Sequence, residues 1–164
     1  MRRLREDGEP RAPHGFLIRQ MTVEDLPAVM ALEQAAFKNP WSQELLKREL
    51  QHEWSTILLV EEAQEAGPPL LLGLAIFWIV HDEVHVLNVA TAPQHRRRGV
   101  ARAVMEEVLE RGRGRRCSLA TLEVRKSNEA AIQLYRDFGF RPVGIRPNYY
   151  ADEGEDAVVM VLDF

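Results

Sequence analysis

Residues 86–101 read Val-Leu-Asn-Val-Ala-Thr-Ala-Pro-Gln-His-Arg-Arg-Arg-Gly-Val-Ala and carry the most informative pattern in the chain. An apolar strand runs into a turn rich in arginine and then directly into a helix. The first turn of a helix has unpaired backbone N–H groups and a partial positive charge. Gly99 would let an anion approach that backbone, and the neighbouring arginines add positive charge. The segment therefore predicts a cradle for a phosphate or pyrophosphate group.

A simpler interpretation of the same residues is a run of solvated arginines at the start of a surface helix. The Lys-Ser/Thr pair of a P-loop and the G-x-G-x-x-G dinucleotide fingerprint are both missing from the sequence. The segment from His95 to Arg116 contains eight arginines and three glutamates and so has a net charge of +5, whereas the whole chain has a net charge of −4. Such local charge favours a compact anionic ligand over a nucleic-acid track, which needs a wide basic face.

Length and composition favour one soluble domain. A chain of 164 residues with 46% hydrophobic and 28% charged residues can bury its own core and is not disordered. We expect a polar N-terminal tail at 1–15 and a single domain at 16–164. The single cysteine, Cys117, excludes a disulfide framework and fits a reducing cytoplasm. The longest apolar run, 70–80, falls well short of the roughly 20 residues of a membrane helix.

Hydrophobic periodicity predicts seven strands and four helices. The expected strands are 16–19, 56–61, 70–80, 84–91, 119–124, 140–145 and 157–162. The expected helices are 22–36, a short one after Ser42, 99–110 and 128–138, the third ending before Gly112. This order is typical of an α/β (α+β) fold with a mixed seven-stranded sheet and helices on both faces.

The arginine-glycine turn forms a larger pattern with other segments. It has the form R-x-x-G-x-A at Arg96, Gly99 and Ala101, and related segments follow at 122–125, 127–135 and 138–140. This combination resembles the GNAT superfamily of N-acetyltransferases over about 16–164. The segments Ala36-Phe37, Pro40-Trp41-Ser42 and 146–160 resemble the branch that acetylates the N-terminal alanine of ribosomal protein S18. Alanine at 101, where glycine is common, and the extra pair Lys38-Asn39 depart from the pattern.

The resemblance implies that acetyl-CoA is the cosubstrate. Backbone groups of Val89, Ala90 and Thr91 would hold the pantetheine arm. The pyrophosphate would lie on the turn and first helical residues, mostly on backbone N–H groups: Arg96, Arg97, Arg98, Gly99, Val100, Ala101 and Arg102. Asn128 would also touch the cofactor, although it is equally suited to cap the following helix, and both roles can hold at once.

Two residues are implied in proton transfer. By the resemblance, Glu123 is the general base that takes the proton of the acceptor amine, directly or through one water. Without the resemblance, the preferred interpretation of Glu123 is a strand carboxylate paired with Arg125. The resemblance also makes Tyr135 the acid that protonates the departing thiolate. The helical spacing of Tyr135 from Ile132 and Phe138 equally suits a core aromatic residue.

Acceptor binding is assigned to Trp41, Tyr149 and Tyr150, because aromatic walls suit a peptide better than a polyamine. Acids at 152, 153 and 155 would attract a basic peptide, as expected for a ribosomal protein. Two alternatives remain: a related enzyme with broader N-terminal or small-amine acceptors, and a non-catalytic acyl-CoA-binding module. We expect a monomer that binds neither nucleic acid nor a membrane. A metal site at His81 and His85 is not expected, since on a strand they would lie about 13 Å apart.

Overall fold

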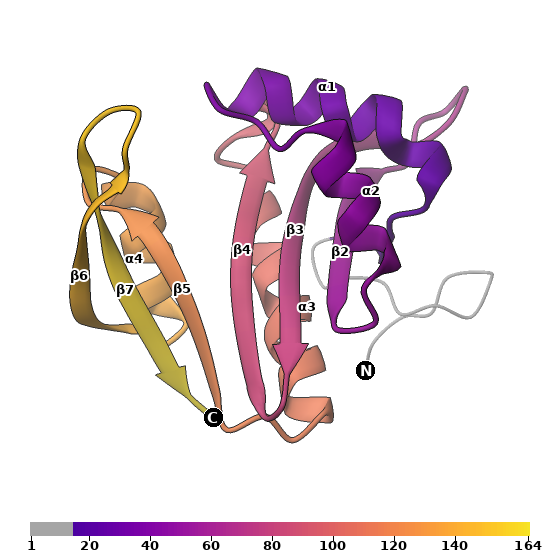
Figure 1. Ribbon diagram of the computed structural model, residues 1–164. Coiled ribbons are helices and arrows are strands. Elements are labelled where there is room, and N and C mark those ends of the chain that lie inside the picture. The colour runs from indigo at the N-terminus through magenta and orange to yellow at the C-terminus, as the bar shows by residue number, and fades with distance from the viewer. Residues whose placement is uncertain (1–14) are drawn as a thin grey trace. The chain divides into compact units, whose positions relative to one another are not determined.

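The computed structural model describes residues 15–164 and contains seven strands and four α-helices in that range (Figure 1). The strands are β1 (Leu17–Gln20), β2 (Ser55–Glu62), β3 (Leu70–Val80), β4 (Glu83–Thr91), β5 (Leu119–Arg125), β6 (Arg141–Tyr150) and β7 (Glu155–Asp163). The helices are α1 (Leu26–Ala36), α2 (Gln43–Gln51), α3 (Val100–Gly114) and α4 (Glu129–Asp137).

The strands form one mixed sheet in the order β1-β2-β3-β4-β5-β7-β6. β4 and β5 are parallel, whereas β1 with β2, β5 with β7, and β6 with β7 are antiparallel. The predicted mixed seven-stranded sheet is therefore confirmed. By their contacts, the described residues divide into two compact units, one up to Phe77 together with Asn88–Val108, the other Trp78–Leu87 together with Leu109–Phe164.

In the first unit, helices cover both faces of the strands. Figure 1 shows α2 in front of β2, α1 across the upper ends of the strands, and α3 behind β3. At the start of α2 the Ser42 hydroxyl accepts a hydrogen bond from the Leu45 backbone N–H (3.1 Å). The signal at Thr22 starts a 3-10 turn, Val23–Asp25, that leads into α1, and there the Thr22 backbone N–H donates to Asp25 (2.8 Å). The apolar faces meet in a core that includes Val29, Leu46, Leu58, Leu74 and Val104, all fully buried.

In the second unit, β5 separates a buried face from a partly exposed one. Its residues alternate, so that Ala120, Leu122 and Val124 are buried while Glu123 and its neighbours on the other face are partly exposed. α4 lies along one face of β5 and β7 (Figure 1). β6 is an edge strand whose residues are nearly all exposed, and it contains two prolines, Pro142 and Pro147.

Two predicted boundaries are wrong. Helix α3 does not end before Gly112 but continues through it to Gly114. A Cβ at Gly112 would lie 2.7 Å from a Val84 methyl carbon and 3.0 Å from the Phe164 ring, so the glycine permits close packing rather than ending the helix. β6 also extends to Tyr150, which places Tyr149 and Tyr150 on a strand end and not in a loop.

Residues 1–14 of the predicted tail lie outside the described residues. Within 15–164, none of the helices is long and apolar enough to cross a membrane.

Candidate active site

The turn before α3 has the backbone geometry of the predicted anion cradle. Arg97 and Gly99 both have positive φ angles, 64° and 84°. The first helical hydrogen bond runs from the Ala103 N–H to the Gly99 carbonyl (2.9 Å), so Val100 and Ala101 have no acceptor within the helix. A Cβ at Gly99 would meet no atom within 4 Å. The turn thus leaves open space beside helical N–H donors, which fits a pyrophosphate group.

The side chain of Arg98 is engaged elsewhere. It forms an ion pair with Glu62 at the end of β2, hydrogen-bonds to the His95 ring (3.0 Å), and lies 5.7 Å from the centre of the Phe16 ring. Arg96 and Arg97 are exposed and have no polar partner within the described part of the chain. Arg98 is therefore suited to contribute its backbone, while Arg96 and Arg97 can offer their guanidinium groups.

A glycine on β3 allows the end of β4 and the start of α3 to pack closely against that strand. A Cβ at Gly73 would lie 2.6 Å from the Ala90 carbonyl oxygen and 2.7 Å from a Val100 methyl carbon. The Ala92 N–H also donates to the Leu72 carbonyl (2.8 Å), which fixes the end of β4. Gly73 is not among the predicted site residues, although an isolated glycine inside an apolar strand is a signal of close backbone approach.

The predicted acceptor residue Trp41 follows α1 and is tied to a buried carboxylate. The backbone N–H of Trp41 donates to Oε2 of Glu33 (3.2 Å), and the Asn88 side-chain amide donates to Oε1 of the same carboxylate (2.5 Å). Glu33 is fully buried. Burial raises its pKa, and the hydrogen bonds from Trp41 and Asn88 oppose that rise. No local pattern could have predicted this contact, because Glu33 and Asn88 are 55 residues apart.

In the second unit, Glu123 pairs with a residue that the sequence analysis did not consider. Its carboxylate lies 3.5 Å from the Arg146 guanidinium, and its side chain is 24% exposed. The alternative pairing with Arg125 is wrong: Arg125 lies within 3.3 Å of both Glu153 and Glu155. Glu123 is therefore oriented by a cation on β6 and still accessible to solvent.

Tyr135 is buried and its hydroxyl has no hydrogen-bond partner within residues 15–164. Its ring packs edge-on against Phe140, with centroids 5.9 Å apart. Burial, together with nearby Tyr150, raises the pKa of Tyr135 to about 12. Burial also raises the pKa of Tyr150 to about 12, with Glu123 among the smaller contributions in the same direction. The core and proton-donor interpretations of Tyr135 are thus compatible.

The remaining predicted residues of this unit lie near the β6–β7 turn or at the start of α4. Tyr149 and Tyr150 pack edge-on with centroids 5.1 Å apart. The Arg125 guanidinium lies 4.1 Å from the centre of the Tyr150 ring. Asn128 caps α4 by accepting a hydrogen bond from the Ala131 N–H (3.1 Å), as its alternative role requires. Its side chain is exposed and can meet a ligand as well.

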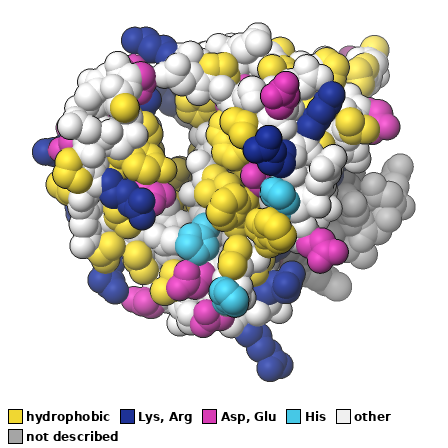
Figure 2. All heavy atoms as spheres, viewed as in Figure 1, with side chains coloured by type: hydrophobic (Ala, Val, Ile, Leu, Met, Phe, Trp, Pro, Cys, Tyr) yellow, Lys and Arg dark blue, Asp and Glu magenta, His cyan; other side chains and the backbone are white. Residues whose placement is uncertain are grey.

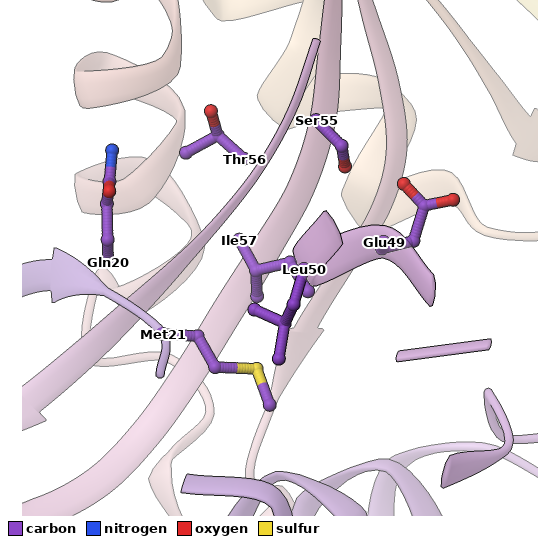
Figure 3. A pocket seen from close by; sticks show the side chains of 7 residues that line it. All are labelled: Gln20, Met21, Glu49, Leu50, Ser55, Thr56 and Ile57. Carbon is purple, nitrogen blue, oxygen red and sulfur yellow. The ribbon is translucent and has the colours of Figure 1, made fainter. Parts of the chain in front are cut away.

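A separate small pocket lies between β1, the end of α2 and the start of β2 (Figure 3). It is lined by Gln20, Met21, Glu49, Leu50, Ser55, Thr56 and Ile57, and none of these is a predicted site residue. His81 lies in the turn between β3 and β4 and not on a strand, as the φ of 54° requires. Across 15–164 there is no group of three His, Cys, Asp or Glu side chains that could hold a metal ion.

Comparison with known proteins gives matches to a single family along most of the chain. Residues 26–140 match the model of the acetyltransferase (GNAT) family. The chain is 35% identical over 147 residues to the ribosomal protein bS18-alanine N-acetyltransferase of Escherichia coli K12, covering 88% of this chain and 95% of that protein. It is 30% identical over 149 residues to the enzyme of the same name from Haemophilus ducreyi, covering 89% and 99%.

A solved structure gives the same result for the fold. The crystal structure of the ribosomal-protein-S18-alanine N-acetyltransferase from Escherichia coli matches with a TM-score of 0.80 at 35% identity, covering 90% of this chain and 93% of that one. The expected fold and the expected family are confirmed. This chain belongs to the GNAT family of acetyltransferases.

Proposed function

We propose that this protein transfers the acetyl group of acetyl-CoA to the α-amino group of an N-terminal alanine, that of ribosomal protein bS18. The proposal is supported by relatives of that name that are 30–35% identical along nearly their whole length. The observation that carries the chemistry is the set of Glu123, Tyr150 and Tyr135 in one unit: Tyr150 helps to raise the pKa of Tyr135, and Glu123 helps to raise the pKa of Tyr150. A binding module without catalysis would have no need of an accessible carboxylate and an unpartnered phenol.

Acetyl-CoA would bind mainly through backbone groups. The N–H groups at the start of α3 would receive the pyrophosphate, with Arg96 and Arg97 adding charge from outside. The end of β4, Val89 to Thr91, would hydrogen-bond to the pantetheine arm. Asn128 would contact the cofactor from the start of α4. Arg98 would hold the turn in place through Glu62 while its backbone contributes to the grip.

The reaction would be direct attack of the amine on the thioester. Glu123 would accept the proton of the amine, and the Tyr135 hydroxyl would donate a proton to the departing thiolate. An α-amino group has an ordinary pKa near 7.7–8.0, so a part of it is already neutral at neutral pH. With a pKa of about 12, Tyr135 stays protonated throughout the neutral range and is always ready to donate. No acyl-enzyme is needed, so Cys117 has no part in the chemistry.

The acceptor would meet Trp41, Tyr149 and Tyr150. Asp152 and Glu153 lie in the β6–β7 turn and Glu155 begins β7, and all three already pair with Arg125. We infer that a basic peptide is favoured there, because it adds further partners to these carboxylates. Peptide rather than polyamine recognition rests on the exposed ring of Tyr149.

We further infer a cytoplasmic monomer, formed by the domain at 16–164, that meets the substrate protein rather than RNA. On the face shown in Figure 2, Lys and Arg side chains are scattered among acidic ones. A nucleic-acid surface usually gathers basic side chains on one face. The charge of the chain, −4, points the same way.

The decisive test uses peptides of the same length and the same basic sequence after the first residue. Four are compared by mass spectrometry after incubation with acetyl-CoA: one beginning with Ala, one with Met, one with Leu, and one with a blocked N-terminus and an internal lysine. Rapid acetylation of the Ala peptide alone supports the proposal. Equal rates on all four would show that the enzyme does not select an N-terminus. No product from any of them would refute the proposed acceptor.

A further inference from the structure

Glu33 is a buried charge with two partners from separate parts of the first unit. It lies on α1, its two oxygens accept from the Trp41 N–H and from the Asn88 amide, and none of it reaches solvent. A carboxylate is rarely buried unless its hydrogen bonds are satisfied. Burying an apolar side chain at this place in the core would cost less free energy than burying an acid. The structural advantage of an acid here therefore lies in its hydrogen bonds.

The two partners belong to elements with different roles. Trp41 lies in the connection from α1 to α2, residues 37–42, which carries the predicted acceptor-binding ring. Asn88 lies on β4, directly before the segment Val89 to Thr91 assigned to the pantetheine arm. One carboxylate therefore links the acceptor-binding connection to the cofactor-binding strand.

We propose that Glu33 is a positioning residue: it fixes the backbone of the Pro40–Trp41 connection onto β4 and so sets where the acceptor peptide lies. It touches neither substrate and moves no proton. β4 is held by neighbouring strands on both sides, whereas the Trp41 N–H depends on Glu33. Loss of the carboxylate should therefore move the connection and leave the strand in place. This inference rests on the proposed function in that Trp41 is taken to contact the acceptor.

The hydrogen-bond pattern allows an exchange experiment. In Asn88→Asp, two carboxylates would face each other in the core, which should be the most damaging single change. In the double variant Glu33→Gln with Asn88→Asp, the new amide can accept from the Trp41 N–H and donate to the new carboxylate at 88. Acid and amide have then changed places, and the link is restored. Glu61→Gln serves as control, because Glu61 is also buried in this unit but pairs with Arg19.

The readouts are KM for the alanine-starting peptide, KM for acetyl-CoA, and hydrogen exchange of the Trp41 amide. Glu33→Ala should raise the peptide KM by roughly 10-fold or more, since misplacement of about 1 Å can cost on the order of 10²-fold in rate. KM for acetyl-CoA should change by much less, and the Trp41 amide should exchange faster. The double variant should recover most of the peptide KM, and Glu61→Gln should leave it unchanged.

A folded Glu33→Ala enzyme with an unchanged peptide KM would overturn the inference. So would equal rises in KM for peptide and for acetyl-CoA, which would indicate general loosening. If Asn88→Asp fails to fold, refolding on addition of Glu33→Gln still supports the pair. If the wild-type enzyme does not acetylate the peptide at all, the proposed function fails. In that case unchanged exchange at Trp41 in Glu33→Ala refutes the link, and faster exchange supports it.

Discussion

The carboxylate of Glu123 on β5 lies 3.5 Å from the guanidinium of Arg146 on β6, although β7 runs between these two strands. Both side chains therefore reach across the same face of the sheet. The Arg146 side chain is 59% exposed and that of Glu123 is 24% exposed, so the pair is worth at most about 1 kcal/mol. Its effect is to orient the carboxylate rather than to stabilise the fold.

Replacing Glu123 by Gln should lower turnover by roughly 10²–10⁴-fold, the usual range for a lost general base. The loss should be largest at low pH, where fewer acceptor amines are already neutral. Initial rates across the neutral pH range measure this. Arg146→Met is the control, since it removes the orienting cation and keeps the base, and it should cost far less. Full activity in Glu123→Gln would show that Glu123 is not the general base and serves only as the ion-pair partner of Arg146.

Tyr135→Phe should fold as the wild type does and turn over much more slowly. The ring and its edge-on contact with Phe140 remain, while the unpartnered hydroxyl is removed. A drop in kcat with an unchanged melting temperature is the expected pair of results. Because the pKa of Tyr135 is about 12, the wild-type rate should show no loss from ionisation of this phenol below about pH 11. An active Phe variant would make Tyr135 a core residue only.

Gly99→Val should weaken acetyl-CoA binding, measured by calorimetry, while the fold is kept. The added side chain would enter the open space of the cradle and would also carry roughly 1–2 kcal/mol of backbone strain at φ 84°. Gly67→Val is a matched control, since Gly67 has φ 85°, an equally open Cβ position and a place in the β2–β3 loop. Equal affinity in both variants would place the pyrophosphate elsewhere. Arg97→Ala should have the smaller effect.

Glu33→Gln should change the stability of the protein in a pH-dependent way. The pKa of Glu33 is raised in the folded state by burial, so its contribution to stability is fully present below the ordinary pKa of about 4.3. That contribution is lost as the pH rises through the raised value. The wild type should therefore lose stability relative to the Gln variant on going from acid to neutral pH, by at most about 1.4 kcal/mol per pH unit. Urea unfolding of both proteins measures the difference. A constant difference would mean that Glu33 does not titrate in this range.

Local patterns in the sequence were sufficient for most of the fold. The strand–turn–helix pattern around Gly99 predicted the open turn before α3 that the structure shows, and this pattern depends on neighbours within a few residues. The Asn128 cap likewise follows from one residue type at one helix start. These features could be predicted because their physical causes are short-range.

Long-range contacts account for what the sequence did not reveal. Gly112 looked like a helix end because its close packing against Val84 and Phe164 depends on chain segments far away. Arg125 is two residues from Glu123 on the same strand, which suggested a pair. In the structure Arg125 pairs with Glu153 of the β6–β7 turn, and Glu123 pairs with Arg146 of β6. Glu33 had the appearance of an ordinary polar helix residue, because its partner Asn88 comes 55 residues later.

The exposed edge strand β6 bears on how the protein behaves when it is concentrated. An edge strand with bare apolar residues, here Val143 and Ile145, can add strands from other molecules and so begin aggregation. Pro142 and Pro147 each lack a backbone donor, and the register shifts along β6 interrupt its regular pairing. A foreign strand would find no continuous ladder to join. The same outer strand that supplies Arg146 is thus protected against growing into larger sheets.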